Sequence, residues 1–326
     1  TRLGAYDFIE KPVSMAKLLV TVNNALEAGR LKRENAGLKR QAPTAMEPLG
    51  RSLAVQNLRQ RLERVAAHDA PVLISGEAGV GKEQAARWIH AHSRRNDGPF
   101  VAAPTRIEAQ GWRNLLLGSG DQQGLLAQSQ GGVLFINDIT LLDAAAQSLL
   151  LRILESGLLE PDSSTSEALD IRIISGAGTQ LADLVRSGRL DESLYYRLNV
   201  LPLEIPPLRE RQEDVPDLVR FYAEYFPARD GLPYRHFSTA AQNRLRQHRW
   251  PGNLRELKNL IQRLLILGGG DEVSVAEIDE ALAQVDAVSA APGQQVPSLF
   301  RLPLREAREE FERQYLTHRL KLAEGS

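Results

Sequence analysis

The chain has 326 residues, of which 43% are hydrophobic and 25% are charged, and its formal net charge is -1. This length is enough for about two or three domains with a sizeable core, and the near-neutral charge excludes a general attraction to nucleic acid, so any such binding must be local. Cysteine is absent, which excludes disulfides and thiolate metal sites, and no signal peptide or bilayer-long apolar run is present, so we expect a cytoplasmic protein.

The first segment, residues 1–28, is predicted to hold a strand, the tripeptide EKP and a helix. Residues 3–12 (LGAYDFIEKP) resemble the last part of a two-component receiver domain. The resemblance implies that Lys11 is the receiver lysine that pairs with the phosphorylated aspartate, and that a sensor histidine kinase is a partner. That aspartate would lie upstream of Thr1, so this segment would be the C-terminal fragment of a receiver. Without the resemblance, Lys11 would be an ordinary exposed lysine.

Residues 29–48 are predicted to be a helical linker. Ala28, Leu31, Asn35 and Leu38 have the spacing of a and d positions, and an asparagine at an a position favours a parallel dimer. The repeat covers only two heptads and contains two glycines, which weaken a helix. A dimerising helix and a plain solvated helix therefore both remain open.

A strand-like apolar run at residues 72–75 is followed by a glycine-rich stretch, residues 76–83 (GEAGVGKE). Strand, glycine-rich turn and helix are the layout of a phosphate-binding P-loop, in which backbone N–H groups and the helix end face an anion. Lys82 would supply a point charge for the terminal phosphates, whereas Glu83 replaces the usual magnesium-binding Ser or Thr. A chance glycine-rich loop is the alternative. The predicted nucleotide-binding residues here are Gly76, Glu77, Ala78, Gly79, Val80, Gly81, Lys82 and Glu83.

Between residues 49 and 216, helical stretches alternate with apolar strand-like runs, which indicates an α/β fold with a parallel sheet covered by helices. Residues 217–285 are predicted to be mostly helical. A loose Ala/Pro/Gln/Ser linker follows at 286–303, and residues 304–326 form a charged helix. The strand-like runs are residues 72–75, 133–136, 171–175 and 200–203.

Further motifs follow the P-loop in a fixed order: GGVLF at 131–135, LYYRLN at 194–199, PPLRER at 206–211, EDVP at 213–216 and WPGNLREL at 250–257. Together they resemble the AAA+ domain of the NtrC-type bacterial enhancer-binding proteins. The resemblance covers roughly residues 49–285. It implies a P-loop α/β subdomain at 49–216 with a helical lid at 217–285, preceded by the receiver fragment. Residues 304–326 resemble the first helix of a Fis-like DNA-binding domain.

The same resemblance implies functional residues outside the P-loop. Family members are ring-forming ATPases that use a GAFTGA loop to remodel RNA polymerase carrying sigma-54. Matching positions for catalysis are Asp138 and Arg197. Matching positions in the nucleotide pocket are Asn137, Leu208, Arg209 and Arg255. Each could instead be structural; Arg255, for example, could pair only with Glu256 at the surface.

Several positions depart from the family pattern. Asn137 brings no charge to a magnesium ion, and Asp138 is one methylene shorter than the catalytic glutamate of the family. A displacement near 1 Å can cost about a hundredfold in rate. Residues 177–178 (AG) replace a Thr-Asn sensor, and Asp191 stands where an intersubunit arginine is expected. The GAFTGA segment is missing altogether, because residues 116–118 (LLG) lead directly through 119–123 to the next motif.

These losses affect hydrolysis and polymerase coupling, whereas the binding features survive. We therefore expect a response-regulator transcription factor that binds ATP or ADP, holds Mg²⁺ weakly at most and hydrolyses ATP slowly or not at all. It would act as a dimer or higher oligomer, bind DNA through a helix-turn-helix and reach RNA polymerase without sigma-54 remodelling. One alternative is an active sigma-54-activating ATPase. Another is a receptor for a different nucleotide, such as a cyclic dinucleotide, held by Arg51, Lys82 and Arg87.

Overall fold

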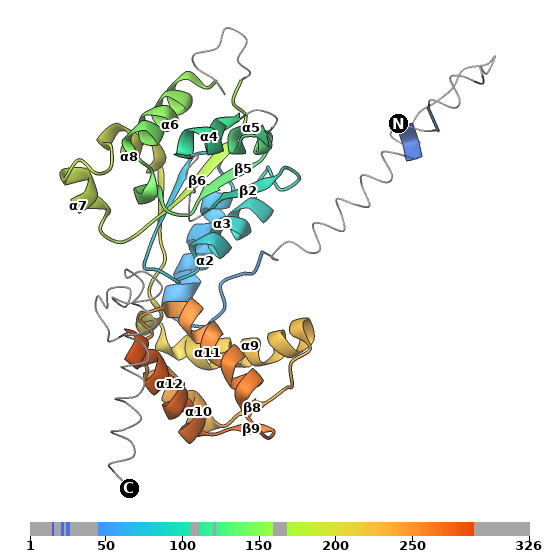
Figure 1. The fold of residues 1–326 in the computed structure, drawn as a ribbon, viewed down its shortest axis with the longest axis vertical. Helices are drawn as coiled ribbons and strands as arrows, with labels where there is room; N and C mark the ends of the chain where they lie inside the picture. Colours follow the sequence, from blue (N-terminus) through green and yellow to red (C-terminus); the bar gives the residue numbers. More distant parts are fainter. Residues whose placement is uncertain are drawn as a thin grey trace, which may run out of the picture. The chain divides into compact units, whose positions relative to one another are not determined.

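The computed structural model describes residues 45–104, 111–119, 122–158 and 168–289, together with isolated helical positions between Met15 and Leu26 (Figure 1). The receiver fragment with Lys11, most of the linkers at 29–48 and 286–303, and the segment at 304–326 are predictions that lie outside these residues. The described chain divides into two compact units. Unit 1 runs to Asp214 and includes Trp250–Arg255, and unit 2 consists of Val215–Arg249 and the residues from Glu256 onward.

Unit 1 is built on a five-stranded sheet of order β2-β5-β6-β1-β7, in which every pair of neighbouring strands is parallel. This confirms the predicted parallel α/β fold. Four strands match or nearly match the predicted runs, and the edge strand β2 was not predicted. The strands are β1 (Val72–Ser75), β2 (Phe100–Ala103), β5 (Val133–Ile136), β6 (Arg172–Ala177) and β7 (Leu201–Glu204).

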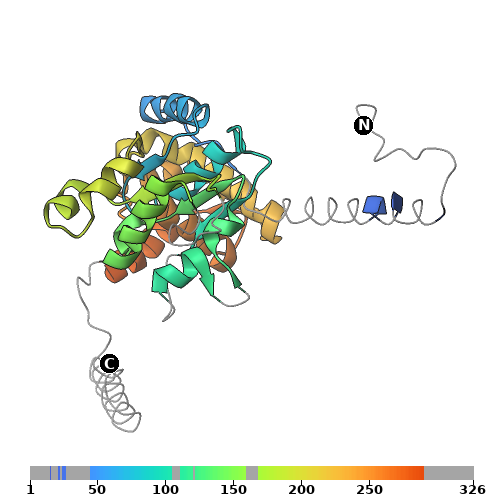
Figure 2. The same cartoon turned by 90° about the horizontal axis from the view of Figure 1, so that it is seen from above.

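The strands are continuous apolar runs because both faces of the sheet are covered by helices. Alternate residues face opposite sides, so Leu134 and Ile136 join the core under α4, α6 and α8, whereas Val133 and Phe135 join the core under α2 and α3. Figures 1 and 2 show these helices on either side of the sheet. The helices of unit 1 are α2 (Leu53–Ala66), α3 (Lys82–Ala91), α4 (Gly111–Leu117), α5 (Leu125–Gln128), α6 (Ala144–Ser156), α7 (Leu181–Arg186) and α8 (Glu192–Leu198).

A buried carboxylate, that of Asp214, holds the segment that precedes α2. Asp214, at the end of the short helix η3 (Gln212–Asp214), is fully buried and accepts hydrogen bonds from the N–H groups of Arg51 and Ser52 and from the Ser52 hydroxyl. The Ser52 hydroxyl in turn accepts a hydrogen bond from Val55 N and caps α2. A Cβ at Gly50 would lie 2.3 Å from the Asp214 carboxyl carbon, so this approach requires glycine.

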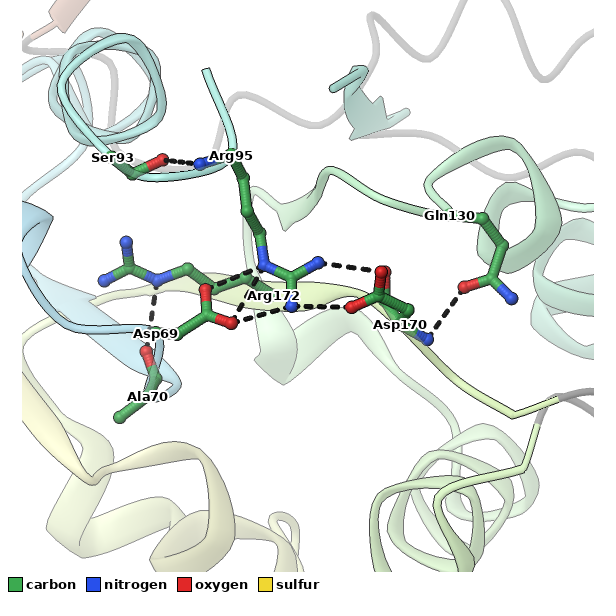
Figure 3. Close-up of polar contacts among 7 residues, drawn as sticks. All are labelled: Asp69, Ala70, Ser93, Arg95, Gln130, Asp170 and Arg172. Atoms are coloured by element: carbon green, nitrogen blue, oxygen red, sulfur yellow. Dashed lines mark hydrogen bonds and ion pairs between the residues drawn. The ribbon is translucent and has the colours of Figure 1, made fainter. Parts of the chain in front are cut away.

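A charged cluster ties together the amino edge of the sheet (Figure 3). Arg95 donates to both carboxylate oxygens of Asp69 and pairs with Asp170 at 2.7 Å. These bonds hold the pKa of Asp69 below its usual value. Arg172, which is 1% exposed, donates to the carbonyl oxygens of Val65 and Ala70, and so fastens β6 to the end of α2.

Unit 2 is mainly helical and is organised around a buried arginine. Arg235 is 1% exposed; its guanidinium donates to the carbonyls of Leu264, Gly269, Gly270 and Glu272 and pairs with the Glu277 carboxylate. Such a network satisfies a buried charge through many acceptors. The elements of this unit are α9 (Val215–Asp230), α10 (Thr239–Gln247), α12 (Val275–Ser289), most of α11 (Asn253–Leu267), and the short parallel strands β8 (His236–Phe237) and β9 (Glu272–Val273).

Candidate nucleotide site

The predicted P-loop connects the carboxyl end of β1 with the first turn of α3. Gly79 and Gly81 have φ values of 80° and 103°, in the left-handed region that favours glycine. A Cβ at Gly79 would lie 2.2 Å from the Gly252 carbonyl oxygen, so the close approach of residues 250–255 also requires glycine there. The loop thus turns directly onto the amino end of α3, where free N–H groups and the helix dipole favour an anion.

Lys82 points back over this loop. Its ammonium donates to the carbonyl oxygens of Gly76 at 2.8 Å and Glu77 at 3.0 Å. Burial lowers the pKa of Lys82, with Asp138 raising it and Arg255 lowering it further. The charges of Asp138 and Arg255 thus act on the lysine, and Arg255 N also donates to the Gly79 carbonyl oxygen of the loop at 3.3 Å.

Glu77, in the P-loop itself, forms a bidentate ion pair with Arg209 at 2.6 and 2.8 Å. Arg209 belongs to the short helix η2 (Leu208–Glu210), so the pair joins two segments that are distant in sequence. The hydrogen bonds from Arg209 and Asn253 lower the pKa of Glu77 to about 2. Of the two predicted pocket residues on η2, Arg209 is ion-paired with Glu77 of the loop, and Leu208 is fully buried.

Asn137 and Asp138, at the positions of the family's acidic pair, directly follow β5 at the carboxyl end of the strands. Asp138 caps the short helix η1 (Ile139–Leu141), and its Oδ1 accepts hydrogen bonds from Thr140 N at 3.0 Å and from the Thr140 hydroxyl at 2.7 Å. The carbonyl oxygen of Asn137 would lie 2.2 Å from a Cβ at Gly176, so this pair packs closely. Glu83 accepts two hydrogen bonds from Arg87, one turn along α3.

Arg197 lies on α8 and Asp191 directly precedes this helix, and both make contacts that were not predicted. The Arg197 guanidinium donates to the Leu154 carbonyl near the end of α6, at 3.2 Å. The Asp191 carboxylate accepts from Leu194 N at 2.9 Å and caps α8. An aspartate is a favourable N-cap, and the pattern DESL shows this signal in the sequence. No contact of Arg197 with the P-loop is found in the described part of the chain.

The segment between α4 and α5 is short. Residues Gly118–Ser119 (β3) pair with Gln122–Gln123 (β4) as an antiparallel ladder, and residues 120–121 between them are not described. A Cβ at Gly124 would lie 2.3 Å from the Leu116 carbonyl oxygen, so the chain enters α5 tightly against the end of α4.

One residue of the site was missed as a functional candidate. Asn253 is fully buried with φ 53°, and its side chain contacts both Glu77 and Ala78 of the P-loop. The sequence contained it within the WPGNLREL motif but gave no reason for a contact with a loop about 175 positions earlier.

Metal ligation by protein alone is not supported in the part of the chain that the structure describes. No group of three or more His, Cys, Asp or Glu side chains that could hold an ion occurs there. Magnesium ions bound with nucleotides need only one or two carboxylates beside phosphate oxygens, and Asp138 fits that requirement. No helix among the described residues is long and apolar enough to cross a membrane.

The sheet order, the loop after β1 and the residues gathered around Lys82 define a P-loop domain of the AAA+ class. Comparison with protein families agrees: residues 49–204 match the Sigma-54 interaction domain and residues 209–295 match the AAA+ ATPase lid domain.

Comparison with individual proteins identifies the family within this class. The chain is 41% identical to the nitrogen assimilation regulatory protein NtrX of Azorhizobium caulinodans, over 96% of this chain and 71% of that protein. It is 38% identical to the DNA-binding transcriptional regulator NtrC of a Bradyrhizobium species, over 86% of this chain and 60% of that protein. A solved structure of NtrX from Brucella abortus in complex with ATP is similar, with a TM-score of 0.73 at 36% identity, over 96% of this chain and 70% of that one. The chain therefore belongs to the NtrX/NtrC family of two-component response regulators.

Proposed function

We propose that unit 1 binds an adenine nucleotide, ATP or ADP, with its phosphates on the P-loop. The observation that carries the proposal is the position of Lys82, whose ammonium lies over the loop and is bonded to neutral carbonyl oxygens. Neutral hydrogen-bond partners do not cancel the positive charge of the ammonium, so an anionic ligand can still bind to it. Two NtrX structures from Brucella abortus that are similar to this chain are complexes with ATP and with ADP, which supports the proposal.

We further propose that the bound ATP is hydrolysed slowly or not at all. Asn137 supplies no charge for a metal, and the Oδ1 atom of Asp138 is engaged by Thr140. A magnesium ion held by Asp138 and the phosphates would polarise the phosphate oxygens. The residues that remain bind and position the phosphates, whereas Asp191, which caps α8, would face a neighbouring triphosphate with a repulsive charge.

In this proposal the protein regulates transcription without remodelling the sigma-54 polymerase. The missing GAFTGA segment supports it, because the short β3–β4 ladder occupies the place between α4 and α5. Residues 1–28 would be the receiver fragment that responds to a sensor histidine kinase, and residues 304–326 would be the first helix of a Fis-like DNA-binding domain. Dimers or higher oligomers would then place two such domains on a palindromic site.

A second candidate is a working ATPase that activates sigma-54 transcription. The match of residues 49–204 to the Sigma-54 interaction domain favours it, as does the negative charge of Asp138, which raises the pKa of Lys82. In vitro transcription with sigma-54 polymerase separates the candidates: open complexes that depend on ATP and on this protein would support the second candidate and refute the first.

Calorimetry tests the binding proposal directly. Titration with ATP, ADP, GTP and a cyclic dinucleotide should give heat for the adenine nucleotides, and the K82A variant should bind them about a hundredfold or more weakly. Tighter binding of the cyclic dinucleotide than of ATP would overturn the assignment. Of the cations that such a ligand would need, Arg87 is already paired with Glu83 at 2.7 Å, which makes this outcome unexpected.

A further inference from the structure

Asn253 is the residue that joins the P-loop to the segment carrying Arg209. Its Oδ1 accepts a hydrogen bond from Leu208 N at 2.8 Å, and its Nδ2 donates to the Ala78 carbonyl at 3.0 Å and to Glu77 Oε2 at 3.1 Å. All three partners belong to the same compact unit. One buried amide therefore uses its acceptor on one segment and both of its donors on the other.

The side chain at this position must satisfy three requirements. It must accept one hydrogen bond, donate two, and tolerate a φ of 53° without exposure to water. Asparagine is among the few residues other than glycine that adopt this left-handed conformation readily, and its amide has both a donor and an acceptor end. Uncommon backbone conformations of this kind persist where the surrounding structure over-determines them, and they cluster at active sites and ligand clamps.

Several contacts beside Asn253 also involve the phosphate-binding turn. Gly79 lies against the Gly252 carbonyl, and Gly79 O accepts a hydrogen bond from Arg255 N at 3.3 Å. Glu77 Oε2, which Asn253 contacts, also accepts from Arg209 at 2.8 Å. Asn253 is thus placed where it fixes the carbonyls of the loop and the two arginines predicted to face the nucleotide.

We propose that Asn253 is a positioning residue of the nucleotide site. It sets the conformation of the loop at Glu77 and Ala78, and it keeps Arg209 and Arg255 at their positions beside this loop. The inference rests on the proposed binding of nucleotide to the P-loop. It also predicts that α11, which begins at Asn253 and continues beyond Arg255, responds to nucleotide from its first turn.

A charge-exchange cycle tests the role of Asn253. In N253D the new carboxylate still accepts from Leu208 N but faces the Glu77 carboxylate and the Ala78 carbonyl, so ATP affinity should fall by about tenfold. In E77Q/N253D the amide and the carboxylate exchange places, and affinity should recover at least about threefold over N253D. The N199D variant is a matched control and should bind ATP normally, because Asn199 caps the carboxyl end of α8 and its side chain donates locally to the Tyr195 hydroxyl.

The outcomes decide between positioning and mere packing. Calorimetric affinity and thermal midpoint are measured on each variant; recovery of affinity in the exchanged pair supports the proposal. Wild-type affinity in folded N253D, or purely additive losses in the double variant, overturns it. If N253D does not fold, hydrogen exchange of the unaltered protein decides: ATP should change exchange in the first turn of α11 at least about threefold, and no change there refutes the role. Failure of the unaltered protein to bind ATP would instead contradict the proposed function itself.

Discussion

Charged side chains lie at both ends of the parallel strands in unit 1, at an amino edge and a carboxyl edge of the sheet. The charges at these two ends have different kinds of partner. At the amino edge, Arg95 is matched by the carboxylates of Asp69 and Asp170 (Figure 3). At the carboxyl edge, the Lys82 ammonium donates to backbone carbonyls, and within the described residues no carboxylate lies at ion-pair distance from it. The first arrangement neutralises its charge internally and serves the fold. The second leaves a cation that an anionic ligand can neutralise, at the edge where parallel sheets bind ligands.

The sharpest way to test this contrast is to remove Lys82. K82A should weaken ATP binding by about a hundredfold or more, because it removes the point charge nearest the phosphates. Calorimetry measures the change. R95A, at the opposite edge, should bind ATP as the unaltered protein does, and equal losses in the two variants would show that the edges do not differ in function.

Restoring the acidic pair should sharpen the distinction between binding and turnover. N137D/D138E returns a metal-binding charge and the longer carboxylate, so the ATPase rate should rise by about tenfold or more while ATP affinity changes little. A coupled phosphate-release assay measures the rate, with K82A in the same background as the blank. An unchanged rate would mean that other groups limit hydrolysis.

Loss of the structural arginine should appear in stability alone. R95A breaks the pairs with Asp69 and Asp170, and because those carboxylates are substantially exposed we expect a loss of about 1 kcal/mol in the free energy of unfolding. Urea unfolding measures it. R186A, which breaks an exposed pair with Asp183, is the matched control and should change stability much less.

The smallest effect concerns pH. The pKa of Glu77 falls from its ordinary 4.5 to about 2, so its pair with Arg209 stabilises the fold above pH 4.5 and loses this contribution as the pH falls toward 2. The stability difference between the unaltered protein and E77Q should be about 0.5 kcal/mol at pH 7 and should shrink across that interval. A difference that grows with acid would reverse the sign and contradict the pairing.

Local sequence patterns predicted the framework well because its signals are local. Runs of buried apolar residues gave β1 and β5 at their observed bounds, and the glycine-rich stretch after β1 forms the expected turn. β6 and β7 each begin one residue later than predicted. The strand β2 was missed because it is a short edge strand whose residues are partly exposed.

The long-range contacts of the site could not be predicted from local patterns. Glu77 and Arg209 are 132 positions apart, and Glu77 and Asn253 are 176 apart, so their meeting depends on the whole fold. The residue pattern that begins at Asp191 is typical of a helix N-cap. Because the family resemblance places an arginine at this position, Asp191 was interpreted as a lost arginine and the cap was not predicted. Asp138 shows the reverse case, because its place directly after the strand at 133–136 was expected and its bond to Thr140 was not.

The fate of bound ATP tests the central claim most directly. The protein is incubated with saturating ATP and Mg²⁺, separated from free nucleotide, and the bound nucleotide is identified over time. We predict that it is recovered mainly as ATP, with fewer than about one turnover per minute, against about 1–1,000 per second for typical enzymes. Rapid conversion to ADP, at rates in that enzymatic range, would contradict the account of a site that binds a triphosphate without efficiently cleaving it.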